Sequence, residues 1–327
     1  MSDHILQVND LITSFETDGG WLRAVDKVSF DVPKGKTVGI VGESGCGKSV
    51  TAMSIMRLLP QPMGQILGGS ILFDGKELTG VDRKQMINIR GNDIGVIFQE
   101  PMTALNPSHR IGKQISEVFL LHTGMSKKEA WEASIKILHK VKIPSPELRV
   151  GEYPHQLSGG MRQRVVIAMA LACSPKLLIA DEPTTALDVT VQAQILDLIE
   201  ELQRDMGMSV ILITHDLGVI AQACDEVVVM YAGRVAEKAP VEELFANPRH
   251  AYTKGLLASI PTLDTPRKSE LNTIPGNVAS IHDFVRGCRF CQRMEVPVSQ
   301  LTERPDFQEI NPGHWVETCP RCYTDNP

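Results

Sequence analysis

The segment "GESGCGKS", residues 42–49, contains the residue types that bind a phosphate chain. It matches the pattern G-x-x-x-x-G-K-[ST], follows an apolar run and precedes a helical pattern. Glycines let the backbone N–H groups converge on phosphate oxygens, and the start of the following helix adds its positive end. Lys48 is expected to reach the β- and γ-phosphates, and the Ser49 hydroxyl to ligate Mg²⁺. The nucleotide-binding residues expected here are Gly42, Glu43, Ser44, Gly45, Cys46, Gly47, Lys48, Ser49 and Val50, with Cys46 at a variable position.

Two acids end the apolar run "LLIADEP", residues 177–183. An acid at the end of a buried strand is costly unless something binds it. Asp181 is expected to hold the Mg²⁺ shell, and Glu182 to polarise a water in line with the γ-phosphate. Alone, the pair could equally be two solvated acids at a strand end, but the phosphate loop in the same chain favours the catalytic interpretation.

Four of the seven cysteines form two C-x-x-C pairs near the end of the chain, Cys288 with Cys291 and Cys319 with Cys322. Four thiols at this spacing can close one tetrahedral zinc site or ligate an iron–sulfur cluster. Free thiols on a poorly ordered tail are the alternative. No catalytic base accompanies them, so a structural or sensing role is expected.

Strand and helix patterns alternate along the chain, which predicts an α/β fold with a largely parallel sheet. Residues 188–207 form the clearest amphipathic helical pattern, closed by a glycine. The stretch from about 100 to 160 carries helical patterns, such as 126–141, and reads as a helical insertion. Regularity fades after residue 262, which predicts a main domain over 1–262 and a small irregular extension over 263–327. The predicted strands are 5–11, 37–42, 70–75, 94–99, 176–181, 209–215 and 226–233, of which the last four are apolar enough to be buried on both faces.

Composition describes a globular chain of 327 residues, 43% hydrophobic and 22% charged, with a net charge of −6. The net negative charge of the whole chain does not favour nucleic-acid binding. No apolar run approaches the ~20 residues of a membrane span, and the polar start predicts no signal peptide. A cytosolic chain is expected to keep its cysteines reduced, metal-bound or buried. Cys173 and Cys224 are expected to be small core residues on helical faces.

Further motifs identify a family resemblance over residues 5 to 262. "LSGGMRQR" (157–164) closely resembles the signature of ABC-transporter ATPases. "FQEP" (98–101) resembles the Q-loop, "ALD" (186–188) the D-loop and "THD" (214–216) the H-switch, all in the family's order. The resemblance implies a P-loop NTPase (RecA-like) core of the ABC ATPase type with a helical subdomain at about 100–160.

The resemblance also implies a paired nucleotide site. Ser158, Gly159 and Gly160 would cap the ATP bound by an opposite subunit, since their N–H groups begin a helix. The D-loop residue Asp188 would join the same site, so that two subunits pair head to tail around two ATP molecules.

The remaining roles follow from the same resemblance. Gln99 would ligate Mg²⁺ together with Ser49 and Asp181, sense the attacking water and link the site to the helical insertion. His215 would contact the γ-phosphate and hold Glu182 and the water, although a histidine closing a strand is ordinarily a core residue. An aromatic side chain should stack on adenine, Phe15 as first choice and Trp21 as second. The expected catalytic residues are Glu182, His215 and Gln99.

Finer resemblance points to the oligopeptide/dipeptide/nickel branch of ABC importers. "FQEPMTALNP" (98–107), "RHAYTKGLLASIP" (249–261) and "TIPGNV" (273–278) carry it. The branch implies a second, homologous ATPase subunit, two transmembrane permease subunits and an external solute-binding protein. The chain would then lie at the cytoplasmic face of the inner membrane and contact it only through the permeases. Peptide is the expected solute, with sugar oligomers or nickel as alternatives. A soluble ABC ATPase acting on nucleic acid is less well supported, because the chain has one cassette and no basic stripe. An exporter subunit is less well supported, because the segment from the Q-loop to the signature and the tail both favour import.

The cysteine tail departs from the pattern of the branch, G-C-x-F-x-P-R-C-P with two further cysteines, which holds an iron–sulfur cluster in several members. Cys288 matches the first position and Cys319 the last. Met294 stands where the second cysteine is expected, whereas Cys291 and Cys322 are additional. Because the count of four is kept, a shared metal is expected, as a [4Fe–4S] cluster with Zn²⁺ as the alternative.

Overall fold

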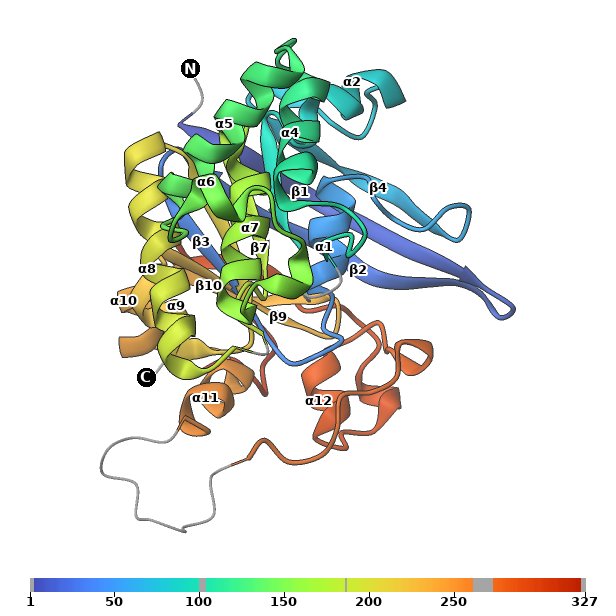
Figure 1. Cartoon of the computed structure of the whole chain (residues 1–327). Coiled ribbons are helices and arrows are strands. Elements are labelled where there is room, and N and C mark those ends of the chain that lie inside the picture. The colour runs from blue at the N-terminus through green and yellow to red at the C-terminus, as the bar shows by residue number, and fades with distance from the viewer. Residues whose placement is uncertain (1–2, 100–103, 186, 261–272, 325–327) are drawn as a thin grey trace. The chain divides into compact units, whose positions relative to one another are not determined.

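The computed structural model describes residues 3–99, 104–185, 187–260 and 273–324 (Figure 1). It divides into two compact units, each built from separate stretches of the chain. Unit 1 comprises Met1–Ile5, Val32–Lys36 and Gly80–Leu212. Unit 2 comprises Leu6–Asp31, Thr37–Thr79 and Ile213–Pro327.

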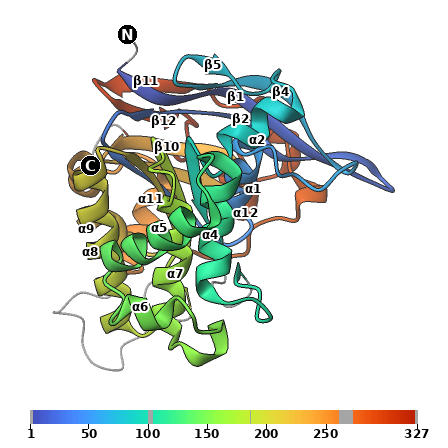
Figure 2. The ribbon, with the colours of Figure 1, turned by 45° about the horizontal axis from the view of Figure 1, so that its top comes forward.

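A four-stranded sheet in the N-terminal part of the chain belongs mainly to unit 2 (Figure 2). Its order is β2-β1-β4-β5. Strand β1 pairs antiparallel with β4, which places Phe15 opposite Gly64. The four strands are β1 (His4–Thr17), β2 (Gly20–Pro33), β4 (Gly64–Phe73) and β5 (Lys76–Glu77).

A second run of strands in unit 2 has the order β11-β12-β10-β9-β3. Strand β3 (Thr37–Val41) is buried throughout and pairs in parallel with β9 (Glu226–Tyr231). The antiparallel strands β10 (Arg234–Pro240), β12 (His314–Glu317) and β11 (Phe307–Asn311) continue the run. The last strands, which lie beyond residue 300, therefore belong to the same sheet as β3, the strand that precedes the phosphate loop.

Short helices pack in unit 2 around these strands. They are α1 (Lys48–Ile55), α9 (Leu217–Ala223), α10 (Val241–Ala246), α11 (Ala251–Ala258), η2 (Ile281–Asp283), α12 (Arg289–Arg293) and η3 (Val298–Gln300). One hydrophobic core joins the strand residues Val41 and Val229 to Tyr252 of α11, Phe290 of α12 and the four tail cysteines.

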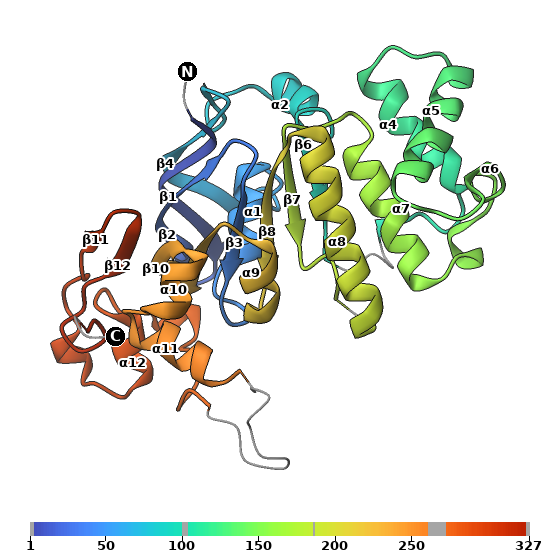
Figure 3. The same ribbon diagram turned by 90° about the vertical axis from the view of Figure 1, so that its left-hand side faces the viewer.

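Unit 1 contains the parallel pair β6 (Ile94–Ile97) and β7 (Leu177–Asp181), with β8 (Ser209–Thr214) next to β7 in strand order. Its helices are α2 (Arg83–Ile89), α4 (Ile111–His122), α5 (Lys127–Lys140), α6 (Pro146–Arg149), η1 (Pro154–Gln156), α7 (Gly159–Leu171) and α8 (Val189–Met206). A capping box of Ser126 and Glu129 starts α5, and Gly207 in the left-handed conformation ends α8. Figure 3 shows α4, α5 and α6 gathered beside α7.

The α/β class and the seven predicted strands are confirmed, although β1 and β4 are longer than the predicted runs. The sequence patterns missed β2, β5, β10, β11 and β12. Cys173 lies in the turn after α7 and Cys224 is the C-cap residue that follows α9, so the predicted place of both on helical faces is wrong. The predicted boundary near residue 262 lies outside the described residues. Within the described parts of the chain, no helix is long and apolar enough to cross a membrane.

Candidate nucleotide-binding residues and a four-cysteine centre

The phosphate loop lies in unit 2, between the end of β3 and the start of α1. Gly42, Gly45 and Gly47 have φ values of 154°, 79° and 104°, which residues with a Cβ rarely adopt. A Cβ at Gly42 would also lie 2.1 Å from the carbonyl oxygen of Met230. Gly47 has no side chain to cap α1, so the first N–H groups of this helix remain suited to an anion.

Lys48 is buried at the start of α1, with 6% of its surface exposed. Its Nζ donates hydrogen bonds to the carbonyl oxygens of Gly42, at 2.7 Å, and Glu43, at 3.1 Å. The loop is therefore curled around the ammonium group. Burial raises the pKa of the neighbouring Cys46 thiol, which stays neutral near pH 7 despite the charge of Lys48.

The predicted water-polarising acid and the Q-loop glutamine meet in unit 1. Asp181 ends β7 and is buried, and Glu182 follows with a left-handed φ of 47°. Gln99 Nε2 donates to Glu182 Oε2 at 3.0 Å, and the Thr185 hydroxyl donates to the same oxygen at 3.0 Å. Sequence reasoning did not identify Thr185. Together, Gln99 and Thr185 orient one oxygen of the carboxylate.

The signature residues begin α7, also in unit 1. Ser158 is its N-cap, and its hydroxyl accepts a hydrogen bond from the backbone N–H of Met161 at 3.4 Å. Gly159 is exposed, and a Cβ added there would meet no atom closer than 3.8 Å. An N–H group at this helix start can therefore be approached closely by a phosphate.

The signature helix α7 packs closely against neighbouring residues of unit 1, and the D-loop residue caps the adjacent helix α8. A Cβ at Gly160 would lie only 2.9 Å from a methyl group of Val191 on α8, so glycine allows the close packing. The D-loop residue Asp188 caps α8, because its Oδ1 accepts from the Val191 N–H at 2.9 Å. The buried Gln163, absent from the sequence-based set, donates from Nε2 to the carbonyl oxygen of Pro183 next to Glu182.

The other predicted nucleotide contacts belong to unit 2. His215 lies between β8 and α9 and is exposed, unlike a core histidine. Phe15 is half-buried on β1, whereas Trp21 is 42% exposed on β2. Trp21 lines a cavity of about 610 Å³ together with Arg286 and Arg304.

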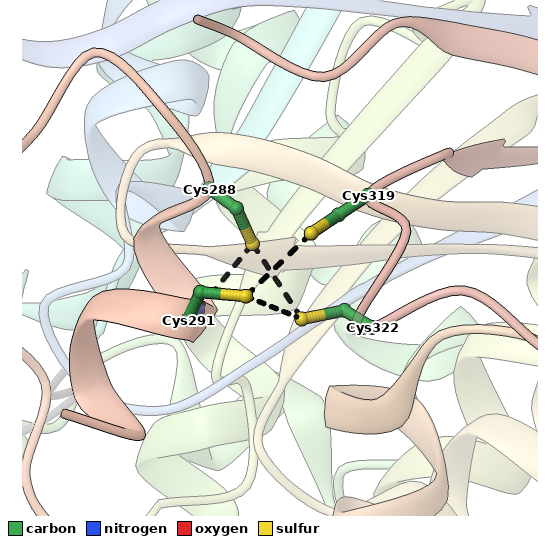
Figure 4. A group of neighbouring side chains, drawn as sticks. All are labelled: Cys288, Cys291, Cys319 and Cys322. Carbon is green, nitrogen blue, oxygen red and sulfur yellow. Dashed lines mark hydrogen bonds between the residues drawn. The ribbon is translucent and has the colours of Figure 1, made fainter. Parts of the chain in front are cut away.

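The four tail cysteines converge from two segments, as Figure 4 shows. Cys288 is the N-cap of α12 and Cys291 lies on its first turn, while Cys319 and Cys322 follow β12. All four are buried, and their Sγ atoms lie within 4.8 Å of one another. The Sγ–Sγ distances are 3.6 Å for 288–322, 3.5 Å for 291–319 and 3.2 Å for 291–322. We refer to this group as the four-cysteine centre.

The chemistry of the four-cysteine centre suits a metal ligand set. The hydrogen bonds from the Cys288 and Cys322 thiols lower the pKa of Cys319, whereas hydrogen bonding to Cys288 and Cys319 raises the pKa of Cys322. Four buried thiols so close together therefore cannot all be ionised on their own. A bound cation would stabilise all four as thiolates. The residues fit a four-thiolate metal site.

A buried ion cluster, missed by sequence reasoning, links β2 to the tail. Asp26 Oδ2 accepts hydrogen bonds from Arg234 and Arg289, both at 3.0 Å, and Arg304 lies 3.5 Å from Oδ1. Arg234 also donates to the carbonyl oxygen of Gly287, beside the first metal-ligand candidate. No local spacing in the sequence signals pairs more than 200 residues apart.

Comparison with known proteins agrees with these features. Residues 25–185 match the family model described as ABC transporter, and residues 236–298 match the model described as oligopeptide/dipeptide transporter, C-terminal region. The solved structure of the dimeric ATP-binding cassette MJ0796 bound to ADP and Pi has a TM-score of 0.64 and 26% identity, covering 72% of this chain and 98% of that one. CbiO1 from Clostridium perfringens has a TM-score of 0.64 and 30% identity, covering 75% of this chain and 92% of that one. The fold and the motif residues therefore define an ATP-hydrolysing subunit of an ABC transporter.

Relatives that match most of the chain show to which branch of ABC transporters it belongs. The chain is 50% identical to the oligopeptide transport ATP-binding protein OppD of Bacillus subtilis, covering 96% of this chain and 88% of that protein. It is 54% identical to the dipeptide transport ATP-binding protein DppD of Bacillus subtilis, covering 89% of this chain and 87% of that protein. The chain belongs to the family of oligopeptide and dipeptide transport ATP-binding proteins.

Proposed function

We propose that this chain hydrolyses ATP to power the import of oligopeptides or dipeptides. The observation that carries the proposal is the identity of 50% and 54% to peptide-transport ATP-binding proteins over 96% and 89% of this chain. The match of residues 236–298 to the C-terminal region of oligopeptide/dipeptide transporters supports the same solute class. Sugar oligomers and nickel are the other solutes to be tested.

The ATP chemistry is assigned to residues of the motifs described above. Lys48 and the phosphate-loop N–H groups would bind the phosphates, and Glu182 would polarise the attacking water. The hydrogen bonds from Gln99 and Thr185 support this role, because they orient one oxygen of the Glu182 carboxylate. His215 would hold the γ-phosphate and the water, and its exposure after β8 suits contact with a ligand.

The residues that would hold Mg²⁺ are Ser49, Gln99 and Asp181. When bound, the ion would supply charge neutralisation at the β- and γ-phosphates. Phe15 is the proposed adenine-stacking residue, since its ring is partly exposed on β1, whereas Trp21 belongs to a basic cavity near the tail.

A second ATPase subunit would complete each site. Ser158, Gly159 and Gly160 of one subunit would bind the nucleotide held by the other, with Asp188 at the same interface. The open helix start at Gly159 supports this role. The partner is proposed to be a different, homologous ATPase subunit, so that the pair is a heterodimer.

The wider assembly would contain two permease subunits and an external solute-binding protein. The chain would lie at the cytoplasmic face of the inner membrane and contact it only through the permeases. Helices of the segment at about 100–160, the proposed helical subdomain of the 1–262 domain, would make this contact.

We also propose that the extension 263–327 holds a metal through the four-cysteine centre. A tetrahedral zinc site has Zn–S bonds of about 2.3 Å, which places its sulfurs roughly 3.8 Å apart. The Sγ atoms all lie within 4.8 Å of one another, with three pairs at 3.2, 3.5 and 3.6 Å, and so close a group suits a single ion. A [4Fe–4S] cluster would be held by the same four thiolates and is larger than one ion, so it would require the sulfurs to lie farther apart. Elemental analysis and absorbance near 400 nm of anaerobically purified protein distinguish the two.

Uptake of labelled peptides tests the transport proposal. Cells that lack this chain should lose uptake of labelled oligopeptides or dipeptides, and the wild-type chain should restore it. The Glu182→Gln variant should bind ATP but restore no uptake, since a general base contributes about 10²–10⁴-fold. Restored uptake by this variant would remove Glu182 from the mechanism, and unchanged peptide uptake without the chain would point to sugar oligomers or nickel.

A further inference from the structure

Glu43, inside the phosphate loop, is held at two of its atoms by residues far along the chain. Its backbone N–H donates to the hydroxyl oxygen of Tyr252 on α11 at 2.9 Å. Its carboxylate Oε2 accepts a hydrogen bond from Arg293 Nη1 on α12 at 2.6 Å. A charged hydrogen bond of this length is among the stronger contacts that a loop can receive.

Arg293 is itself fixed, so it can act as an anchor for the loop. Only 4% of its side chain is exposed. Nε donates to the carbonyl oxygen of Pro275 at 2.8 Å, and Nη2 donates to those of Ile274 and Gly276 at 3.0 and 3.1 Å. The guanidinium group therefore holds Glu43 in one position.

The helix that carries Arg293 is only five residues long and begins at a proposed metal ligand. A helix of this length is not stable alone, because nucleation is costly. Cys288 caps it, with Sγ accepting from the N–H of Cys291 at 3.4 Å. The position of α12 therefore depends on its packing and on whatever holds the two cysteines.

The packing of α12 also leads toward the phosphate loop. The Phe290 ring lies 5.7 Å from the ring of Tyr252 and 5.5 Å from that of Tyr231. Arg289 donates to the carbonyl oxygen of Ala232, and the next residue, Gly233, donates its N–H to the carbonyl oxygen of Cys46 at 2.9 Å. Contacts from α12 thus reach the loop by three routes.

We propose that Arg293 is a positioning residue for the phosphate loop, through which the four-cysteine centre and the nucleotide influence each other's binding. A loaded centre holds α12, α12 holds Arg293, and Arg293 holds the loop in the shape that receives phosphate. Because coupling between two sites is reciprocal, nucleotide should in turn slow the loss of metal. The inference rests on the proposed ATP binding and metal binding of this chain.

Calorimetric measurement of ATP affinity on the full chain, purified with its metal and analysed for zinc and iron, tests the proposal. Arg293→Gln should keep its metal and bind ATP about tenfold more weakly, within the range of typical couplings. Arg321→Gln is the matched control, since Arg321 lies beside Cys322 and its guanidinium donates to Gln300 Oε1 at 2.6 Å rather than to the phosphate loop. This variant should bind ATP as the wild type does. The double variant Glu43→Gln/Arg293→Gln should be no weaker than the weaker single variant. Equal ATP affinity of loaded Arg293→Gln and wild type would overturn the proposal.

Metal release supplies a readout that does not depend on the folding of a variant. Wild-type protein is mixed with a chelator, with and without ADP in the absence of Mg²⁺, and the released metal is followed. Nucleotide should slow release several-fold in the wild type and clearly less in Arg293→Gln, in which only the contacts through Tyr252 and Gly233 remain. Release that ignores nucleotide in the wild type would overturn the coupling. A wild-type chain that binds no ATP would overturn the proposed function itself, and this inference with it.

Discussion

Replacing Asp26 by asparagine tests the buried ion cluster most directly. Asparagine keeps the size of the side chain but removes its charge. Arg234 and Arg289 are 6% and 7% exposed at the side chain, so both would become buried cations without this carboxylate. Removing one partner of a buried ion pair costs about 3–5 kcal/mol. We expect a loss near 3 kcal/mol in the free energy of unfolding. Glu317, 3.7 Å from Arg234, is a weak substitute because burial raises its pKa to about 7.

The direction in which the stabilisation by Asp26 changes with pH follows from the pKa of its carboxyl group. Burial alone would raise the pKa of Asp26, but the charges of Arg234, Arg289 and Arg304 outweigh it, and the pKa falls below the usual 3.8. The stabilisation is therefore fully present above about pH 4 and is lost as the pH falls through the lowered pKa. The difference in free energy of unfolding between wild type and Asp26→Asn should not shrink between pH 7 and pH 5.

Urea unfolding of both proteins at constant metal content, at pH 7, 6 and 5, measures the gap. Asp93→Asn is the control, because Asp93 pairs with Lys176 at 4.0 Å on the surface and such pairs contribute about 0–1 kcal/mol. A gap below 1 kcal/mol for Asp26→Asn, or one that closes between pH 7 and pH 5, would refute the reasoning.

Three further substitutions follow from close contacts. Gly42→Ala should abolish ATP binding measured by calorimetry, since its Cβ would lie 2.1 Å from a backbone oxygen; retained affinity would contradict the loop geometry. Gly39→Ala should lower the free energy of unfolding, measured by urea titration, by about 1–3 kcal/mol. The reason is that its Cβ would lie 2.4 Å from Ile220 and 2.9 Å from Cys224. An unchanged free energy of unfolding would show that the core around Gly39 is packed less tightly than the structure indicates. Cys319→Ser should remove the bound metal measured by elemental analysis, and full metal occupancy would exclude Cys319 as a ligand.

Features that depend on neighbouring residues could be predicted from the sequence. The phosphate loop requires glycines beside a strand and a helix, and the C-x-x-C pair of Cys288 and Cys291 places two thiols on one helical turn. The apolar runs that became β7, β8 and β9 are buried, as their composition predicts.

Contacts between distant residues left no comparable pattern. Glu43 and Arg293 are 250 positions apart, and Asp26 and Arg289 are 263 apart, so neither pair has a local spacing to detect. The hairpin of β11 and β12 was missed for another reason. Its strands have five and four residues, and β11 is mostly exposed, so its apolar pattern is weak.

The order in which unit 2 is assembled has a consequence for synthesis on the ribosome. Its first stretch, Leu6–Asp31, contains Asp26 and the exposed Arg23, which lies 3.5 Å from that carboxylate. The buried arginines that pair with Asp26, Arg234 and Arg289, come after residue 233. The N–H of Ala251 and the carbonyl oxygen of Cys322 bond at 2.7 Å, so the last described turn closes the unit. Unit 1 is complete after Leu212, whereas unit 2 must wait for the tail to leave the ribosome. We therefore expect the first sheet, whose four strands are all present by residue 77, to gain the stabilisation of the buried ion cluster only when translation is almost finished.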